Sequence, residues 1–461
     1  MNLTNMLIKN NYNRTFYLFL LFHLIIWTIV PSVSNLNLPL DTIEALAWGS
    51  NLSWGFEKHP PVSAFMVEFI YSFFGNQDWS YYFLSQLFII IGFVYVWKFS
   101  NLIFKEKIYS LSSIFLLEGI FFYNFTSPEF NVNVCQIPFW AITVFYSWRS
   151  IKYEKISDLV LLGIFMSLGF LSKYLFIYLI LTIKFIFILK VLKDRYINLK
   201  FLIPGVVFLL ILTPHIIWLF NNNFISLSYA LNRTGIDENN LLNHLYNPIL
   251  FLLKQIGILI PISLLIFSFA KFKKFNLIHL KKDRYFLLLI NIIPIALMTI
   301  TSFVSGAKIR TMWMTPFYLF LGVLLIQLYK EDLKKNFRRF LFVFIFFFIL
   351  SPTTYLVVSL SNDFKRTDYP GKEISNLVQR RWDKNFSNNI AVVVGDEWYA
   401  GNLSYHLKSR PVWYNSIENN LSMINSETGV IYTGNPKILE KFCPGIYGTI
   451  KPIGICMIGA K

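Results

Sequence analysis

Long apolar runs separated by short polar segments recur along the first 360 residues of the chain. A helix needs about 20 residues to cross the roughly 30 Å hydrocarbon layer of a membrane. The run over 62–74 is short and predicts a helix that lies along the membrane interface. The runs that we interpret as membrane spans cover residues 16–33, 81–97, 110–125, 132–148, 159–171, 174–189, 201–220, 249–269, 286–304, 312–328 and 340–360. The pattern predicts a polytopic α-helical membrane protein with about eleven transmembrane helices.

The composition supports this interpretation. Hydrophobic residues make up 55% of the chain, aromatic residues 18%, and the mean hydropathy is +0.51. Ordinary soluble domains contain roughly 45–50% apolar residues and more charged ones. A soluble chain of this composition could not cover its apolar surface with polar groups.

The basic residues predict the orientation of the spans. The clusters that fall on one side, if the spans alternate, are Lys9/Arg14, Lys98/Lys105/Lys107, Arg149/Lys152/Lys155, Lys190/Lys193/Arg195/Lys200, Lys271/Lys273/Lys274/Lys281/Lys282/Arg284 and Lys330/Lys334/Lys335/Arg338/Arg339. Cytoplasmic loops carry an excess of lysine and arginine. We therefore expect the N-terminus in the cytoplasm and, after an odd number of spans, residues 361–461 outside. The net charge of +17 then follows from topology and from anionic lipid head groups, and gives little reason to expect a nucleic-acid partner.

The composition changes after residue 360, where short strand-like and helix-like patterns replace the apolar runs. Segments 390–394, 411–414 and 429–432 predict strands, and 397–407 predicts a helix. The alternation predicts a small periplasmic α/β domain over 361–461, beside a transmembrane domain over 1–360. Asp396, Glu397 and Tyr399 follow a strand end, a position typical of a turn and of a binding crevice alike. Cys443 and Cys456 could form a disulfide in an oxidising compartment.

A polar stretch over residues 40–62 interrupts the apolar pattern after the first span. Asp41 and Glu44 are three residues apart and would share one face of a helix. Lys58 and His59 follow, and two prolines then end any helix because they lack an N–H group. Two acids after an apolar run are also typical of a solvated helix face.

This stretch resembles the first extracytoplasmic loop, here 34–78, of bacterial family 39 glycosyltransferases. The resemblance lies in an acid, a second acid three residues on, a Trp-Gly pair and the motif Gly-Phe-x-x-His-Pro-Pro. Shorter elements that are similar to family landmarks follow in order: Phe130-Asn131-x-Asn133, Pro138-x-Trp140, Ser172-Lys173-Tyr174, Pro214-His215-x-x-Trp218-Leu219 and the segment from Lys308 to Pro316.

Relatives in this family include the protein O-mannosyltransferases and the aminoarabinose transferase that modifies lipid A. The resemblance implies the GT-C fold and a sugar donor linked to polyprenyl phosphate, used on the outer face of the bacterial inner membrane. It implies that Asp41 is the catalytic base, with Glu44 as its orienting or acceptor-binding neighbour. The sequence does not name the sugar. The acceptor could be lipid A or lipopolysaccharide, another glycolipid or a protein.

A few basic residues on the predicted outer side are not explained by the orientation rule. Lys58, Lys173, Arg233, Lys308 and Arg310 fall there, and cations at the membrane surface would stabilise the phosphate that leaves the sugar. Arg310 is the preferred clamp because a guanidinium can hold two phosphate oxygens at once. The alternative for each is an interfacial residue that extends to water.

Two histidines complete the candidate donor-binding set. His59 adjoins the two prolines of the motif, and His215 lies near the end of a predicted span, where it could contact the donor head group. A lone histidine is more often a hydrogen-bonded structural residue than a catalyst. The sequence contains no zinc-ligand spacing, so we predict no metal and no cofactor.

The chain also departs from the family pattern. Many enzymes of this type carry a second acid before the fourth span, and the position we align with it holds Asn131 or Asn133, with Glu129 close by. This departure argues against a mechanism that uses two carboxylates.

Two other classes of function remain open. A transporter or flippase of lipid-linked saccharides would place charged residues inside the spans, where Glu118, Lys184 and Lys254 are the candidates. It would also show repeated halves, and none is visible. A non-catalytic envelope-assembly protein would tolerate replacement of Asp41.

Overall fold

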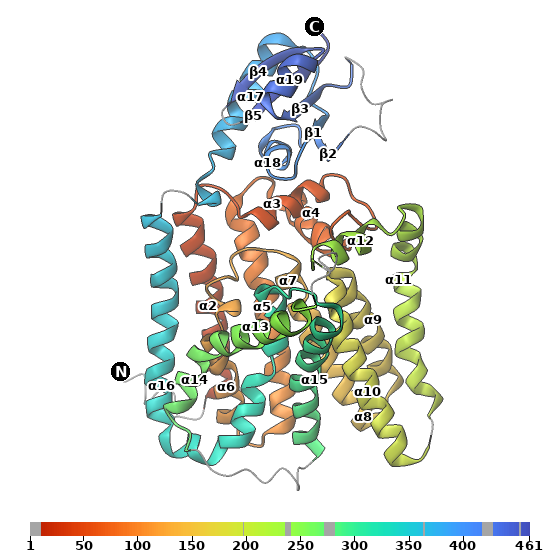
Figure 1. The fold of residues 1–461 in the computed structure, drawn as a ribbon. Helices are drawn as coiled ribbons and strands as arrows, with labels where there is room; N and C mark the ends of the chain where they lie inside the picture. The colour runs from red at the N-terminus through yellow and green to blue at the C-terminus, as the bar shows by residue number, and fades with distance from the viewer. Residues whose placement is uncertain are drawn as a thin grey trace.

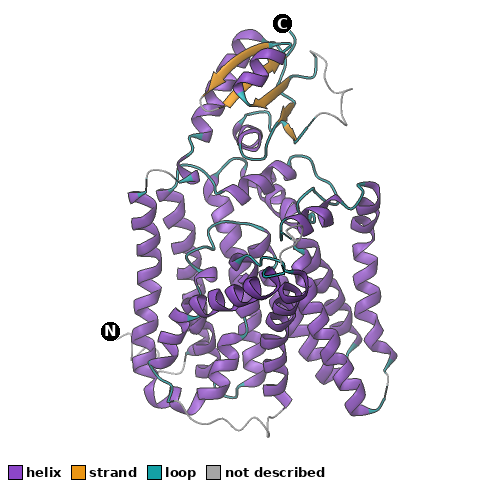
Figure 2. Cartoon of the chain, in the orientation of Figure 1, coloured by secondary structure: helices purple, strands orange, loops and turns teal. Residues whose placement is uncertain are grey.

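A computed structural model describes residues 11–196, 198–235, 241–271, 282–362, 365–416, 427–450 and 453–461. A helical bundle forms the body of the protein, and a small domain that contains all the described strands sits on one end of it (Figure 1, Figure 2). The basic residues Lys9, Lys273, Lys274 and Lys281 lie outside the described ranges. The last turn of α10 (Ile177–Asp194), which carries Lys193, and the connection to α11 (Ile203–Asn221), which carries Arg195, lie at the end of the bundle opposite the small domain (Figure 1).

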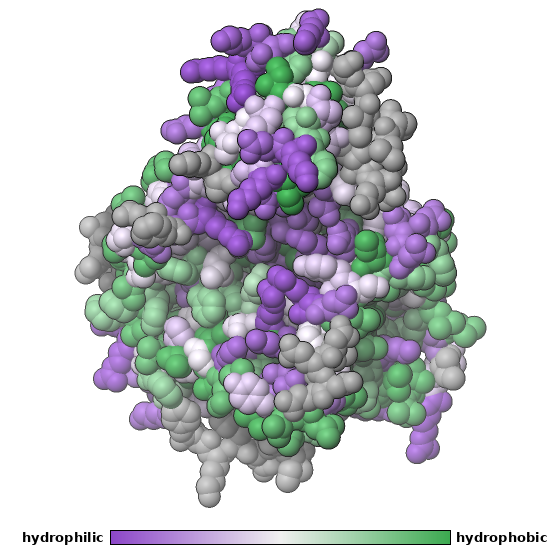
Figure 3. Space-filling model, turned by 45° about the horizontal axis from the view of Figure 1, so that its top comes forward, coloured by the Kyte–Doolittle hydropathy of each residue, from purple (hydrophilic) through white to green (hydrophobic). Residues whose placement is uncertain are grey.

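The apolar runs form most of the helices of the bundle. The longest are α2 (Tyr12–Ser34), α5 (Asp78–Ile103), α10 (Ile177–Asp194), α11 (Ile203–Asn221), α15 (Lys282–Ser305) and α16 (Leu321–Ser361). Among the described residues six helical segments are long and apolar enough to cross a membrane, or seven if the bent pair α13 (Asn243–Ile258) and α14 (Ile260–Phe267) counts as one. The protein is therefore a multi-span membrane protein, while the number eleven stays a prediction. The face in Figure 3 is mainly hydrophobic over the bundle and hydrophilic over the small domain.

Several predicted spans are broken, and prolines or close contacts explain where. The run over 110–125 forms α6 (Lys107–Phe115) and then the 3₁₀ turns η1 (Leu116–Gly119) and η2 (Phe121–Tyr123). A Cβ at Gly119 would lie 2.5 Å from the Ile262 Cα, so this turn packs directly against the backbone of α14. The run over 132–148 divides into α7 (Val132–Cys135) and α8 (Ile137–Tyr153), with a proline in the first turn of α8.

The last two predicted spans also begin or join irregularly. The run over 312–328 begins as the 3₁₀ helix η5 (Thr311–Tyr318), which contains Pro316, and continues into α16. The run over 340–360 lies in the same element, α16, which consists of two helices joined at a kink with non-helical backbone angles at Tyr329 and Asn336. The 249–269 run bends by 44° between α13 and α14, next to a proline that opens α14.

Shorter helices lie among these spans and at the end of the bundle that carries the small domain. In chain order, α9 (Ile156–Ser172) and η3 (Tyr174–Phe176) lie between α8 and α10. The short helix η4 (Leu199–Leu202) directly precedes α11. At the domain end lie α3 (Leu40–Gly49), α4 (Val62–Phe74) and α12 (Ile225–Asn232) (Figure 1). The segment 62–74 thus forms a separate short helix, as its length predicts.

The C-terminal domain has an α/β architecture. Its helices are η6 (Arg366–Asp368), α17 (Gly371–Asn385), α18 (Tyr399–His406) and α19 (Pro436–Phe442), and its strands are β1 (Val392–Val394), β2 (Val412–Tyr414), β3 (Val430–Gly434), β4 (Ile446–Ile450) and β5 (Ile453–Ile458). The strand order is β2-β1-β3-β5-β4. Strand β1 pairs in parallel with β2 and β3, and β5 runs antiparallel to β3 and β4.

Cys443, directly after α19, and Cys456 in β5 form a disulfide. A cross-link that closes a loop of about 15 residues is expected to contribute ~3 kcal/mol in the chain-entropy model. Replacing both cysteines with serine should therefore lower the unfolding temperature of the purified protein, measured by differential scanning fluorimetry. A reductant should lower the wild-type value towards that of the variant and leave the variant unchanged. Equal unfolding temperatures would show that this bond does not limit stability.

Candidate active site

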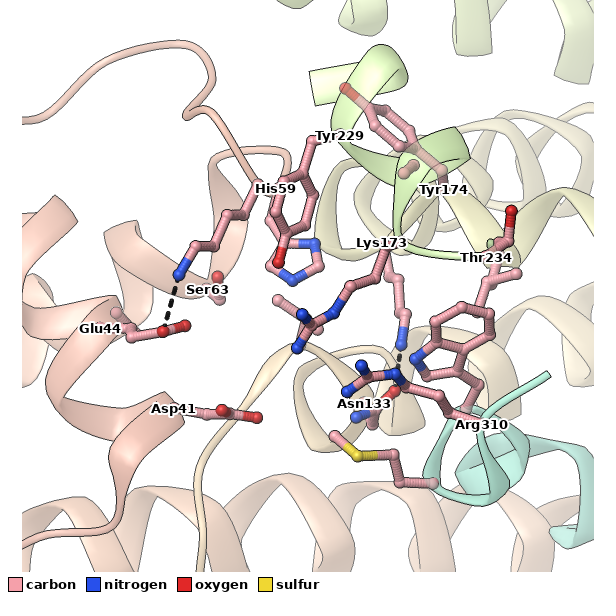
Figure 4. Close-up of a pocket in the computed structure, with 18 of the residues that line it drawn as sticks. Asp41, Glu44, His59, Ser63, Asn133, Lys173, Tyr174, Tyr229, Thr234 and Arg310 are labelled. Carbon is pink, nitrogen blue, oxygen red and sulfur yellow. Dashed lines mark hydrogen bonds and ion pairs between the residues drawn. The ribbon is translucent and has the colours of Figure 1, made fainter. Parts of the chain in front are cut away.

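A cavity of about 310 Å³ lies at the end of the bundle that carries the C-terminal domain. Its walls come from α3, the segment that follows α3, α7, the start of α10, α12 and the start of η5. Acidic side chains stand on one side, at Asp41 and Glu44, and basic ones face them from the other, at Lys173 and Arg310 (Figure 4). The cavity thus has a basic wall opposite an acidic wall formed by Asp41 and Glu44.

Asp41 and Glu44 lie in the first turns of α3 and both line the cavity, as their spacing predicts. The N-terminal end of a helix favours negative charge, because its free N–H groups carry partial positive charge. Burial raises the pKa of the Asp41 carboxyl above its usual range, and the Lys173 ammonium opposes the rise. Burial likewise raises the pKa of Glu44, although its hydrogen bond with the Lys58 ammonium acts to lower it. A carboxylate with a raised pKa is a stronger base than one in water.

Glu129 lies beside Asp41, although its position in the sequence did not lead us to include it among the site residues. Its Oε1 accepts a hydrogen bond from the Asp41 backbone N–H at 3.1 Å. Burial, with repulsion from the neighbouring Asp41 carboxylate, raises the pKa of Glu129 to about 8. Asn131 instead caps α7 through its side-chain oxygen. A second carboxyl group is therefore present next to Asp41, and it is protonated near neutral pH.

Lys173, Arg233 and Arg310 form the basic wall. The buried Lys173 ammonium donates a hydrogen bond to the Asn133 Oδ1 and lies 5.4 Å from the centre of the Trp313 ring. Within the described parts of the chain, neither arginine has an acidic side chain at ion-pair distance. Two guanidinium groups that face a cavity without carboxylate partners are available to an anionic ligand.

The charge state of Lys173 depends on pH in the neutral range. Burial, together with repulsion from Arg310, lowers the pKa of its ammonium to about 7, and Asp41 acts in the opposite direction. An anion that binds beside Lys173 would stabilise the charged form and raise this pKa again.

Lys58 and His59 line the cavity from the segment after α3. The Lys58 ammonium forms ion pairs with Glu44, at 2.8 Å, and with Glu397 of the C-terminal domain, at 3.0 Å. Burial, with the positive charges of Lys173 and Lys58 nearby, lowers the pKa of His59 to about 3. His59 is therefore neutral and a weak base at physiological pH.

The structure places the other two predicted residues outside the cavity lining. His215 is buried in α11, where its ring nitrogens contact the Trp54 carbonyl oxygen at 2.6 Å and the Tyr174 hydroxyl at 2.9 Å. It therefore fixes Tyr174, which does line the cavity. The Lys308 side chain is exposed, and its backbone N–H donates to the Thr234 carbonyl oxygen at 2.9 Å.

Sequence reasoning missed Arg233 and Tyr229, which reach the cavity from α12. The signal was available for Arg233, since it is one of the few basic residues on the predicted outer side. Tyr229 gave no such signal, because a tyrosine in an aromatic-rich chain is unremarkable until its neighbours are known.

Comparisons with known proteins show which proteins this chain resembles in sequence and in fold. A family model described as dolichyl-phosphate-mannose-protein mannosyltransferase matches residues 58–218. The undecaprenyl phosphate-alpha-4-amino-4-deoxy-L-arabinose arabinosyl transferase of Wigglesworthia glossinidia brevipalpis is 30% identical over 127 residues. That alignment covers 26% of this chain and 22% of the relative, so the chain matches about a fifth of the relative's length.

Two crystal structures of ArnT from Cupriavidus metallidurans extend the likeness over nearly the whole chain. The structure bound to undecaprenyl phosphate has a TM-score of 0.62 at 11% identity, and the apo structure a TM-score of 0.60 at 10% identity. Each alignment covers 96% of this chain and 98% of the ArnT chain. The chain therefore has the fold of ArnT, the GT-C fold. The resemblance seen in the motifs and the predicted GT-C fold class are thereby confirmed.

The segment that the family model matches contains only part of the candidate site. Lys58, Lys173 and Glu129 lie inside the segment that the family model matches, whereas Asp41 and Arg310 lie outside it. The shared ArnT fold therefore does not by itself assign a role to either outlying residue. In the described ranges, no group of three or more His, Cys, Asp or Glu side chains could hold a metal ion. The metal-free site stays a prediction.

Proposed function

We propose that this protein transfers a sugar from a polyprenyl-phosphate-linked donor to an acceptor in the bacterial envelope. The observation that carries the proposal is the cavity in which Asp41 and Glu44 face Lys173 and Arg310. Glycosyl transfer from a lipid phosphate needs these two walls, because a proton leaves the acceptor while negative charge grows on the phosphate. We place the reaction on the outer face of the inner membrane, with the N-terminus in the cytoplasm and the C-terminal domain in the periplasm.

In the proposed reaction the donor phosphate lies against Lys173, Arg233 and Arg310. An acceptor hydroxyl attacks the anomeric carbon from the side of Asp41, and the new carbon–oxygen bond forms as the bond to the phosphate oxygen breaks. Asp41 takes the hydroxyl proton, and the lipid phosphate leaves with the bonding electron pair and is stabilised by the cations. If the acceptor group is itself an ionised phosphate, no proton is removed and Asp41 orients the nucleophile.

The relatives support the donor class. The Wigglesworthia relative is named for undecaprenyl phosphate, the matching family is named for dolichyl phosphate, and one ArnT structure has undecaprenyl phosphate bound. All three are polyprenyl phosphates. The acceptor is left as lipid A or lipopolysaccharide, another glycolipid or a protein.

The test is transfer of radiolabelled sugar from synthetic polyprenyl-phosphate donors to extracted envelope lipids and proteins by the purified protein in liposomes. We expect label in an acceptor fraction that depends on both protein and donor. Movement of intact donor across the bilayer without transfer would favour a flippase. Neither transfer nor movement with any donor would favour a non-catalytic role in envelope assembly.

Replacing Glu129 with glutamine tests whether Asp41 acts alone as the base or whether both carboxyl groups take part in the reaction. Glutamine matches the protonated glutamic acid in shape, and its oxygen can still accept the hydrogen bond from the Asp41 N–H. We therefore expect the transfer rate of the Glu129→Gln variant at pH 7 to stay within about 3-fold of wild type, given that the charge of the site is unchanged. A loss as large as that from changing Asp41 would mean that both carboxylates take part in the chemistry.

A further inference from the structure

The C-terminal domain contributes one charged side chain to the ion pairs around the cavity. Glu397 of this domain and Glu44 of α3 both bind the Lys58 ammonium, at 3.0 and 2.8 Å. All three side chains are largely shielded, with exposed fractions of 20% for Lys58, 15% for Glu44 and 14% for Glu397. The pairing joins the cavity to a domain that is more than 300 residues away in the sequence.

The local backbone fixes the position of Glu397. It lies just beyond the carboxyl end of β1, after Gly395, whose φ of +146° is rarely adopted by other residues. A Cβ at Gly395 would also lie 2.2 Å from the Thr433 hydroxyl oxygen. The Asp396 side chain accepts hydrogen bonds from the backbone N–H groups of Trp398 and Tyr399, both at 2.8 Å. Glu397 thus sits in a turn that its neighbours hold in one conformation.

The same face of the domain is anchored to the segment that carries the acidic wall. The Arg410 guanidinium donates to the Leu46 carbonyl oxygen at 2.6 Å and to the Glu68 carboxylate at 2.8 Å. The Trp413 backbone N–H donates to the Ser50 hydroxyl at 2.9 Å. These contacts hold the C-terminal domain against both α3 and α4. Glu397 therefore reaches Lys58 from a domain that these contacts hold in place.

An ammonium group has three N–H donors, and the two carboxylates occupy two of them. The remaining donor is available to a ligand in the cavity that Lys58 lines. The two carboxylates also hold the pKa of Lys58 above its ordinary value despite burial, so the group stays charged. A lysine side chain has many rotamers, and fixing it at two points reduces the entropy lost when a third partner binds.

We propose that Glu397 is a positioning residue of the site, through which the C-terminal domain holds Lys58 in place for the donor phosphate. This inference rests on the proposed function. It predicts that the domain sets the affinity for the donor and leaves the chemical step unchanged. The ligand concerned is a lipid phosphate that shares Lys58 with the two carboxylates.

The test compares Glu397→Ala and Glu397→Gln with wild type. Loss of one partner from a partly exposed ion pair should raise the KM for the donor about 5-fold, the upper end for such pairs, and leave kcat within 2-fold. Glutamine still offers an oxygen to Lys58 and should restore most of the affinity. Glu440→Ala, at an exposed position on α19 of the same domain, is the matched control and should equal wild type.

A Lys58→Met background separates positioning from a general structural role. If Glu397 acts through Lys58, Glu397→Ala should have no further effect on KM once Lys58 is absent. An equal loss in both backgrounds, or a KM in Glu397→Ala equal to wild type, would overturn the inference.

Direct binding keeps this inference separate from the proposed function. The dissociation constant of a C55 polyprenyl monophosphate, measured with the purified protein in detergent, should rise with Glu397→Ala and recover with Glu397→Gln. That pattern without any sugar transfer by wild type would sustain the positioning role and overturn the transferase proposal. Transfer by wild type, together with a dissociation constant that is unchanged in Glu397→Ala, would support the transferase proposal and overturn the positioning role.

Discussion

Replacing Asp41 with asparagine is expected to lower the rate of sugar transfer ~10³-fold, within the range for loss of a general base. Asparagine keeps the size of the side chain and removes the oxygen that takes the proton. The raised pKa of Asp41 makes this carboxylate a better base than one in water. His59, which also lines the cavity, has a pKa of about 3 and cannot replace it near neutral pH. Initial rates with labelled donor at equal protein concentration give the comparison.

Two variants serve as controls for Asp41→Asn. Asp383→Asn makes the same chemical change at an exposed position of α17 and should leave transfer unchanged. Glu129→Gln changes the carboxyl group beside Asp41 and should have little effect at pH 7. Binding of polyprenyl monophosphate to Asp41→Asn should stay within about 3-fold of wild type, because the basic wall is intact. Transfer by Asp41→Asn at the wild-type rate would assign the chemistry to another residue.

Replacing Lys173 with methionine is expected to lower kcat/KM for the donor ~10²-fold, as for removal of one preorganised donor at a site of developing charge. Methionine has nearly the same length and no charge. Lys173 is buried against Trp313 and bound to Asn133, so its ammonium is held in place before the donor arrives. A kcat/KM unchanged by this substitution would contradict the assignment of the phosphate to the basic wall.

The lowered pKa of Lys173 adds a pH dependence to the same prediction. Its ammonium is charged at a pH well below 7 and loses its proton as the pH rises through about 7. The affinity for polyprenyl monophosphate should therefore fall above pH 7 in wild type. Lys173→Arg stays charged throughout. The ratio of the two dissociation constants isolates Lys173, because ionisation of the ligand affects both proteins equally. A ratio that is constant from pH 6 to pH 9 would contradict the pKa of Lys173.

The sequence predicted the helical bundle well because burial in a membrane demands long apolar runs, and these are visible without knowledge of contacts. It did not predict the breaks at η1 and between α7 and α8, since these depend on which helix packs alongside. In the C-terminal domain, α17 went unpredicted because most of its residues are polar. Its apolar residues Ile374, Val378 and Trp382 recur every four residues and are buried.

Part of the candidate site was also predictable from the sequence. Asp41 and Glu44 came from local helix spacing, and Lys173 and Arg310 from charges that the orientation rule left unexplained. His215 and Lys308 looked equivalent to these in sequence, yet His215 contacts Trp54 and Tyr174 from within α11, and the Lys308 side chain is exposed. Lys58 was predicted as a phosphate ligand. One of its carboxylate partners, Glu44, lies on α3 itself, and the other, Glu397, became visible only when the C-terminal domain was placed on α3.

The measurement that tests the central claim most directly is a structure of the protein with a polyprenyl monophosphate bound. We predict that the phosphate lies in the cavity within contact distance of Lys173, Arg233 and Arg310, with Asp41 on the facing wall. A phosphate bound elsewhere on the protein, with this cavity free of ligand, would contradict the account.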